Sequence, residues 1–76
     1  MNLKEAVAVA KQQVNDLFAP DVPQHVRLEQ FLYDDHLWVW SLTIGFVLPD
    51  HAEEARSYEI VRVSEADKSV LSAKDR

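Results

Sequence analysis

The first part of the chain carries apolar residues at helical spacing, which predicts a helix over residues 2–18. The apolar stripe consists of Leu3, Ala6, Val7, Ala10, Val14, Leu17 and Phe18. Asn2 is the expected N-cap, and Glu5, three residues later, can complete a capping box with it. Pro20 and Pro23 follow, and proline cannot continue a helix. The polar face carries no basic cluster, so we expect this helix to pack on a sheet and not on a membrane surface.

An uncharged run of twelve residues, from Leu37 to Leu48, marks the centre of the expected sheet. It predicts a strand over residues 37–47, whose alternate positions share one face. The large apolar side chains on that face are Trp38, Trp40, Leu42, Ile44 and Phe46. Gly45 lies within the strand, where a glycine indicates a bulge or a close backbone approach.

Three further segments have the composition of strands, over residues 25–33, 56–63 and 70–74. The alternation in the first of them slips near Gln30, which indicates a β-bulge. Asp34 and Asp35 form a turn signal before the uncharged run. Because so little chain separates the first two strands, they are expected to be antiparallel neighbours. A polar segment over residues 49–55 separates the second strand from the third.

The order of these elements predicts an α+β fold, with one N-terminal helix packed on an antiparallel meander sheet of three or four strands. A chain of 76 residues is expected to form a single domain over residues 1–76. We find no internal repeat and no change in composition that would mark a second domain.

The charge balance is acidic, with 13 Asp and Glu residues against 8 Lys and Arg residues and a net charge of −5. The basic residues are scattered, so we expect no nucleic-acid partner, whose phosphates are bound by clustered Lys and Arg. An acidic surface suits a basic protein partner, although it also keeps a small domain in solution. The chain has no cysteine and no pattern of a signal peptide, which favours a cytoplasmic location. The uncharged run is shorter than the roughly 20 residues of a membrane-spanning helix, so no membrane partner is expected.

The candidates for chemistry are few. Asp34-Asp35-His36 and Asp50-His51 place carboxylates beside imidazoles, but both are in turns or loops, where such residues are ordinary. His25 stands apart from both, and zinc-ligand spacings are absent from the sequence. The single glycine, Gly45, excludes a glycine-rich phosphate loop. Glu53 and Glu54 lie in a polar loop, where nothing would raise their pKa for acid catalysis. We therefore expect no enzyme, no metal, no cofactor and no catalytic residue.

The aromatic residues are the better indication of function. They either all lie in the core, or one end of the row, at Trp38 or Tyr58, is exposed as a binding anchor. A single helix covers only one face of the sheet, so the other face is open to a partner. The expected interaction residues are Trp38, Val39, Ser41, Thr43 and Tyr58. The leading hypothesis is a non-catalytic protein-interaction module that forms a homodimer or binds a protein through this open face. The alternative is an acidic inhibitor or immunity-type protein that neutralises a toxin or peptidase.

The whole chain, read in this order, resembles a PepSY-type domain. The pieces that carry the resemblance are the alanine-rich helix segment Glu5–Ala10, the strand segments Trp40–Phe46 and Tyr58–Val63, and the final Val70–Ser72. The chain departs from the family pattern in the last turn, where Ser64 replaces the usual Asp and Lys68 the usual Gly. Glycine adopts a positive φ at no steric cost, so this replacement bears on the turn geometry. The resemblance implies the same fold, a role as a small interaction module often linked to restraint of a peptidase, and no catalytic residues.

Overall fold

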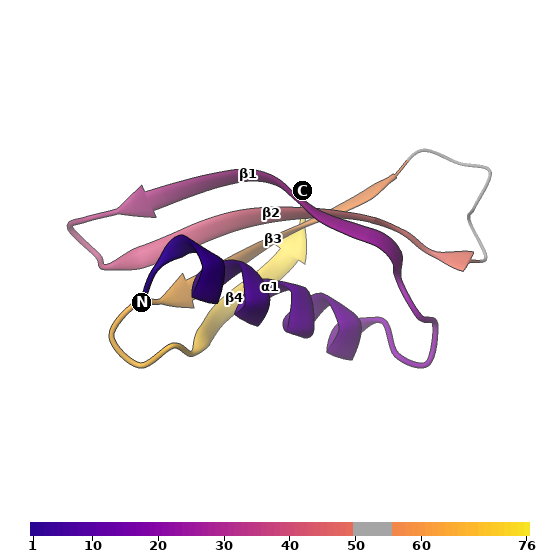
Figure 1. The fold of residues 1–76 in the computed structure, drawn as a ribbon, viewed down its shortest axis with the longest axis horizontal. Coiled ribbons are helices and arrows are strands. Elements are labelled where there is room, and N and C mark those ends of the chain that lie inside the picture. Colours follow the sequence, from indigo (N-terminus) through magenta and orange to yellow (C-terminus); the bar gives the residue numbers. More distant parts are fainter. Residues whose placement is uncertain (50–55) are drawn as a thin grey trace.

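The computed structural model describes residues 1–49 and 56–76, and these residues form one helix and one four-stranded sheet. The strands follow one another in the order β1-β2-β3-β4, and each neighbouring pair is antiparallel (Figure 1). The elements are α1 (Leu3–Leu17), β1 (Gln24–Asp34), β2 (Val39–Val47), β3 (Ser57–Ser64) and β4 (Val70–Asp75). The predicted α+β fold is confirmed, and most boundaries agree with the sequence pattern within one residue.

Helix α1 begins with the predicted capping box. The side-chain oxygen of Asn2 accepts a hydrogen bond from the Glu5 backbone nitrogen at 2.9 Å, and the Glu5 carboxylate accepts one from the Asn2 backbone nitrogen at 3.1 Å. These two bonds satisfy backbone donors that the start of a helix leaves without partners. On the face of α1 that packs against the sheet, Ala6 and Ala10 are fully buried. Their small side chains let the helix approach the sheet closely.

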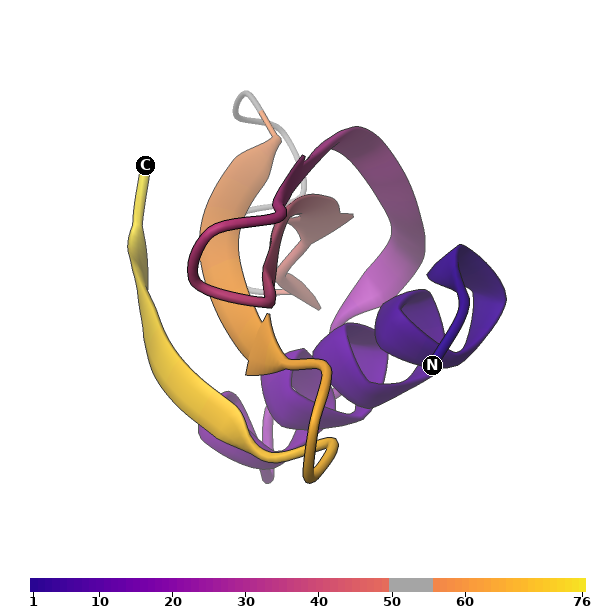
Figure 2. The ribbon, with the colours of Figure 1, turned by 90° about the vertical axis from the view of Figure 1, so that its left-hand side faces the viewer.

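The core lies between α1 and the two central strands. Leu42 pairs with Val61 across β2 and β3, and directly paired residues of an antiparallel sheet share a face. Ile44, Phe46 and Val63 complete the buried surface of that face. Figure 2 shows that the sheet bends around one side of α1, and the helix packs mainly over β2 and β3 and little against β1. Strand β1 therefore receives the least cover.

The irregularity predicted near Gln30 is present one residue earlier. The β1–β2 register shifts between Leu28 and Gln30, so that Glu29 is the extra residue of a bulge. Gly45 lies beneath it, and a Cβ atom at Gly45 would stand 2.6 Å from a carboxylate oxygen of Glu29. The close approach that the glycine indicated is therefore made by the side chain of Glu29.

One prediction about β2 is wrong. The alternation placed Trp38 in the strand beside Trp40, but β2 begins at Val39. Pairing between β1 and β2 ends at Asp34 and Val39, and the four residues between them form a turn. Trp38 closes this turn with a φ of 58° and is 59% exposed. The apolar run begins at Leu37, two residues before β2 starts. The start of β2 is set by its pairing with the last residue of β1, Asp34, and the apolar pattern does not show this.

Candidate functional site

Four of the large apolar side chains that are exposed in the described residues lie near the end of the β1–β2 hairpin. This end forms one extremity of the long axis of the molecule, at the left of Figure 1. We refer to these four residues as the tip surface: Phe31 (51% exposed), Leu32 (67%), Leu37 (62%) and Trp38 (59%). Leu37 and Trp38 come from the turn, and the other two from the last part of β1, where Phe31 faces the helix side of the sheet and Leu32 the opposite side.

Backbone hydrogen bonds hold the turn in place. One side-chain oxygen of Asp34 accepts from the backbone nitrogens of His36 at 2.9 Å and Leu37 at 3.0 Å. The carbonyl of Trp38 accepts from the backbone nitrogen of Glu65 at 2.9 Å, which ties the turn to the end of β3. The exposed side chains of Leu37 and Trp38 thus stand on a fixed backbone and require little ordering before they can contact another protein.

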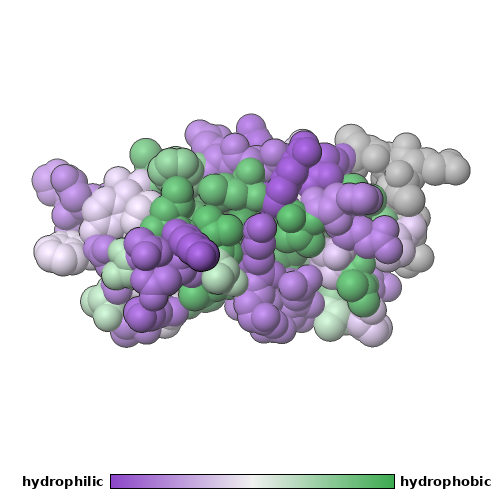
Figure 3. All heavy atoms as spheres, in the orientation of Figure 1, coloured by the Kyte–Doolittle hydropathy of each residue, from purple (hydrophilic) through white to green (hydrophobic). Residues whose placement is uncertain are grey.

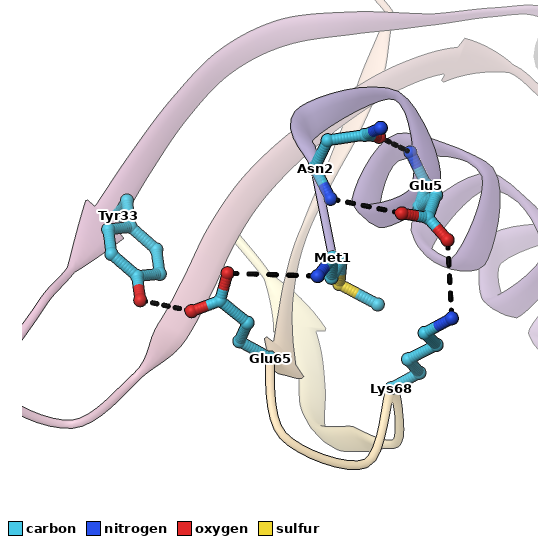
Figure 4. Close-up of polar contacts among 6 residues, drawn as sticks. All are labelled: Met1, Asn2, Glu5, Tyr33, Glu65 and Lys68. Atoms are coloured by element: carbon cyan, nitrogen blue, oxygen red, sulfur yellow. Dashed lines mark hydrogen bonds and ion pairs between the residues drawn. The ribbon is translucent and has the colours of Figure 1, made fainter.

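Aromatic rings support the tip from the helix-facing side of the sheet. The Tyr33 ring lies 4.7 Å from the Trp40 ring, and the Phe31 ring lies 6.5 Å from it, measured between centroids. The Tyr33 hydroxyl donates a hydrogen bond to the Glu65 carboxylate (Figure 4). This bond, more than the burial of the ring, raises the pKa of Tyr33 to about 12. Tyr33 is therefore a neutral donor at physiological pH.

Charged contacts connect this end of the sheet to the start of α1. The other Glu65 oxygen lies 3.9 Å from the Met1 backbone nitrogen, and Lys68 Nζ lies 3.2 Å from the Glu5 carboxylate (Figure 4). The backbone hydrogen bond from Asn2 and the contact with Lys68 hold the pKa of Glu5 below its ordinary value. The β3–β4 turn is thus fastened to both the tip and the helix.

The predicted interaction residues fall in different environments. Trp38 is exposed in the turn, whereas Val39 and Thr43 are only 5% and 8% exposed. Ser41 is half-buried and pairs with Leu32, so that the two side chains share the face away from α1. Tyr58 is half-buried on β3, with the Arg76 guanidinium 5.3 Å from its ring centroid. The structure brings Val39, Ser41 and Thr43 onto one face of β2, and Tyr58 shares that face through its pairing with Gly45, beyond Thr43. Trp38 alone lies off the strand, in the turn.

The middle of the face opposite α1 is covered by charged side chains of the chain itself. Glu29 lies over Gly45 and contacts Arg27 at 3.2 Å and Arg56 at 3.6 Å. These contacts place one carboxylate between two guanidinium groups. The centre of that face is thereby less apolar and less accessible than the sequence pattern indicates.

Sequence reasoning missed one buried acid. Glu59 is 4% exposed and occupies the inward register of β3, in the same alternate series as Val61 and Val63. Burial, together with the carboxyl group of Asp75, its partner residue on β4, raises its pKa to about 7. The alternation of β3 already indicates that Glu59 points inward, so this residue could have been found from the sequence. It lies within the sheet, away from the tip.

A carboxylate and an imidazole are neighbours on the surface of the tip. His36 Nε2 and an Asp35 oxygen are 3.9 Å apart, and both side chains are almost fully exposed. Within residues 1–49 and 56–76, no three His, Cys, Asp or Glu residues converge in a way that could hold a metal ion. The second candidate pair, Asp50-His51, and the paired carboxylates Glu53 and Glu54 lie outside the described residues.

Apolar atoms are also visible on the face that carries α1, where they gather between the helix and β1 (Figure 3). Val26 and Leu28 of β1 pack against the core without being fully buried. The incomplete cover of β1 by the helix thus extends from this region to Phe31. The described part of the chain contains no helix with the length and apolarity needed to cross a bilayer.

Comparison of the chain with protein-family models, with curated proteins and with solved structures found no match. The resemblance to PepSY-type domains therefore stays a prediction.

Proposed function

We propose that the protein is a small non-catalytic protein-interaction module and that its contact surface is the tip surface. The observation that carries this proposal is the exposure of Leu37 and Trp38 on a backbone fixed by Asp34 and Glu65. Tryptophan is enriched among the residues that dominate binding energy, and grouped exposed apolar side chains are typical of interaction sites.

The burial pattern favours the end of the sheet over its centre. In the middle of the sheet Thr43 offers almost no accessible surface to a partner, and Glu29 covers Gly45. Ser41 lies beside Leu32 and adds a hydroxyl at the margin of the tip surface. We therefore place the contact around Trp38 and Leu32, with Ser41 at its edge.

The charges near the tip indicate the chemistry of the partner. Asp34, Asp35 and Glu65 adjoin the apolar side chains, and the chain as a whole has a net charge of −5. A partner with a positively charged surface around an apolar pocket complements this arrangement. Inhibition is one form of this interaction, in which the basic partner is a toxin or a peptidase. The acidic charge of the chain supports this form as well as it supports binding without inhibition.

The test is a binding measurement with a variant of Trp38. The tagged protein captures its partner from the native host at low salt, and mass spectrometry identifies any partner recovered in a fixed ratio. Calorimetry with the purified partner then compares the wild type with Trp38→Asn, because asparagine tolerates the positive φ at this position. We expect the variant to lose about 2–4 kcal/mol of binding free energy, as interface tryptophans typically do.

The matched control is Leu71→Asn, which removes another exposed apolar side chain, 53% accessible, at the far edge of the sheet. Its affinity should stay within about twofold of the wild type, since surface substitutions outside a contact are nearly neutral. Equal affinity of Trp38→Asn and the wild type would exclude the tip as the contact surface.

A further inference from the structure

Strand β1 is an edge strand with apolar side chains on both of its faces. It pairs with β2 on one side, and no strand of the described chain lies on its other side. Phe31 pairs with the core residue Leu42 and so faces the helix side, while Leu32 pairs with Ser41 and faces the opposite side. Both remain more than half exposed. An edge of this kind is a template for the addition of another strand.

The segment from Gln30 to Asp34 is complementary to itself. We propose that it pairs antiparallel with the same segment of a second copy of the chain, about a two-fold axis at Leu32. In a two-fold contact, residue i faces residue j and residue j faces residue i. The register places Leu32 opposite Leu32, Phe31 opposite Tyr33, and Gln30 opposite Asp34. The two four-stranded sheets then form one continuous sheet.

Each of these pairs is chemically favourable. Leucine side chains meet at the axis, and the aromatic pair extends the row that Trp40 and Tyr33 already form in each copy. The Gln30 amide can donate to Asp34, because the two hydrogen bonds in the turn use only one Asp34 oxygen. Leu37 and Trp38 lie outside the paired segment, whereas Phe31 and Leu32 belong to both contacts. This contact therefore does not rest on the proposed function, but it competes with the partner for Leu32.

Two features limit the strength of the contact. The bulge at Glu29 ends the regular part of the edge, so that pairing is restricted to five residues. Two copies, each with a net charge of −5, also repel one another. The contact is therefore smaller than the standard interface of about 800 Å² per partner, and the expected dissociation constant lies between about 1 μM and about 1 mM.

The test is the molar mass in solution over a series of protein concentrations, measured by sedimentation equilibrium. We expect the wild type to approach twice the chain mass at the upper end of the range. Leu32→Lys places two cations next to each other at the axis and should weaken the dimer at least about tenfold, since like charges directly opposite in a sheet destabilise it. Leu71→Lys is the matched control, because it makes the same substitution at an exposed site on β4, the other edge. It should dimerise like the wild type.

Amide chemical shifts of the wild type give a second readout that does not depend on any variant. With rising concentration, the shifts should change mainly at residues 30–34 and not along β4. A wild type that stays monomeric at about 1 mM overturns the proposal, as does equal weakening by Leu32→Lys and Leu71→Lys. A monomer that still binds a partner through Trp38 would overturn this inference alone and leave the proposed function intact.

Discussion

At the scale of the residue, Glu59 connects the fold to pH. Its carboxyl group is buried beside the core face and faces Asp75 on the neighbouring strand. One of its oxygens has no hydrogen-bond partner within the described part of the chain. Removing a carboxylate from water favours its protonated form, and a second carboxyl group nearby has the same effect. These two causes place the pKa of Glu59 at about 7, above its ordinary value of 4.5.

The raised pKa predicts how stability depends on pH. Between about pH 4.5 and pH 7 the folded chain keeps a proton on Glu59 that the unfolded chain has lost, so the free energy of unfolding falls as the pH rises through this window. Glu59→Gln removes this ionisation. The variant should resemble the wild type at pH 4.5 and exceed it at pH 8 by up to about 3 kcal/mol, on the basis of 1.36 kcal/mol per pKa unit. Urea denaturation at both pH values measures the difference.

The control for this prediction is Asp35→Asn, which removes an acid whose side chain is 83% exposed at the tip. Its pH dependence should follow that of the wild type. Parallel pH profiles for Glu59→Gln and the wild type would show that Glu59 ionises in the folded chain with an ordinary pKa.

At the scale of the element, the sequence predicts what is local and misses what depends on pairing. The capping box at Asn2 and Glu5 requires only residues three apart, and the strands follow from alternation, so both were foreseeable. The start of β2 was not, because the alternation runs through Trp38. The turn closes there through the hydrogen bond to Glu65, a residue 27 positions later.

The same reasoning explains which site residues were foreseeable. The exposure of Trp38 was one of two alternatives that the aromatic pattern left open, and the structure agrees with it. The burial of Val39 and Thr43 was not foreseeable, because alternation predicts which face a side chain shares but not what covers that face. At Gly45 the cover is the side chain of Glu29. The carboxylate of Glu29 reaches Gly45 only because the bulge sets the register of β1.

The β3–β4 turn contains a residue with a positive φ that is not a glycine. Lys68 has a φ of 60°, in the left-handed region where glycine is usual, and its backbone nitrogen donates to the Ser64 carbonyl at 2.9 Å. A residue with a Cβ atom incurs a steric cost of roughly 1–2 kcal/mol in this conformation. The contact between Lys68 Nζ and Glu5 compensates only partly, since both side chains are about half exposed.

Two variants of Lys68 separate the backbone cost from the charge. Both Lys68→Gly and Lys68→Gln lose the contact with Glu5, but only glycine relieves the strain. Lys68→Gly should therefore be more stable than Lys68→Gln by about 1 kcal/mol, measured by urea denaturation. Equal stabilities would mean that the turn adopts another conformation in solution.

At the scale of the whole molecule, the net charge distinguishes the two proposed contacts. Attraction to a basic partner weakens as salt screens it, whereas repulsion between two acidic copies is relieved by the same screening. Raising the salt from about 50 mM to about 500 mM should lower the association rate constant with the partner by about tenfold or more and should strengthen self-association. Stopped-flow kinetics and sedimentation measure the two effects. A partner association rate that does not change with salt would contradict the electrostatic part of the proposed function.

The two edges of the sheet differ in a way that bears on how far any assembly can grow. β1 offers the regular apolar segment Gln30–Asp34, whereas the outer edge at β4 carries Lys74 and Asp75, both exposed. Lysine on an edge strand is a common means of preventing further pairing. A sheet that accepts a strand on one side only is completed by the first addition, whether that strand belongs to a second copy or to another protein. The fold therefore favours closed complexes over filaments.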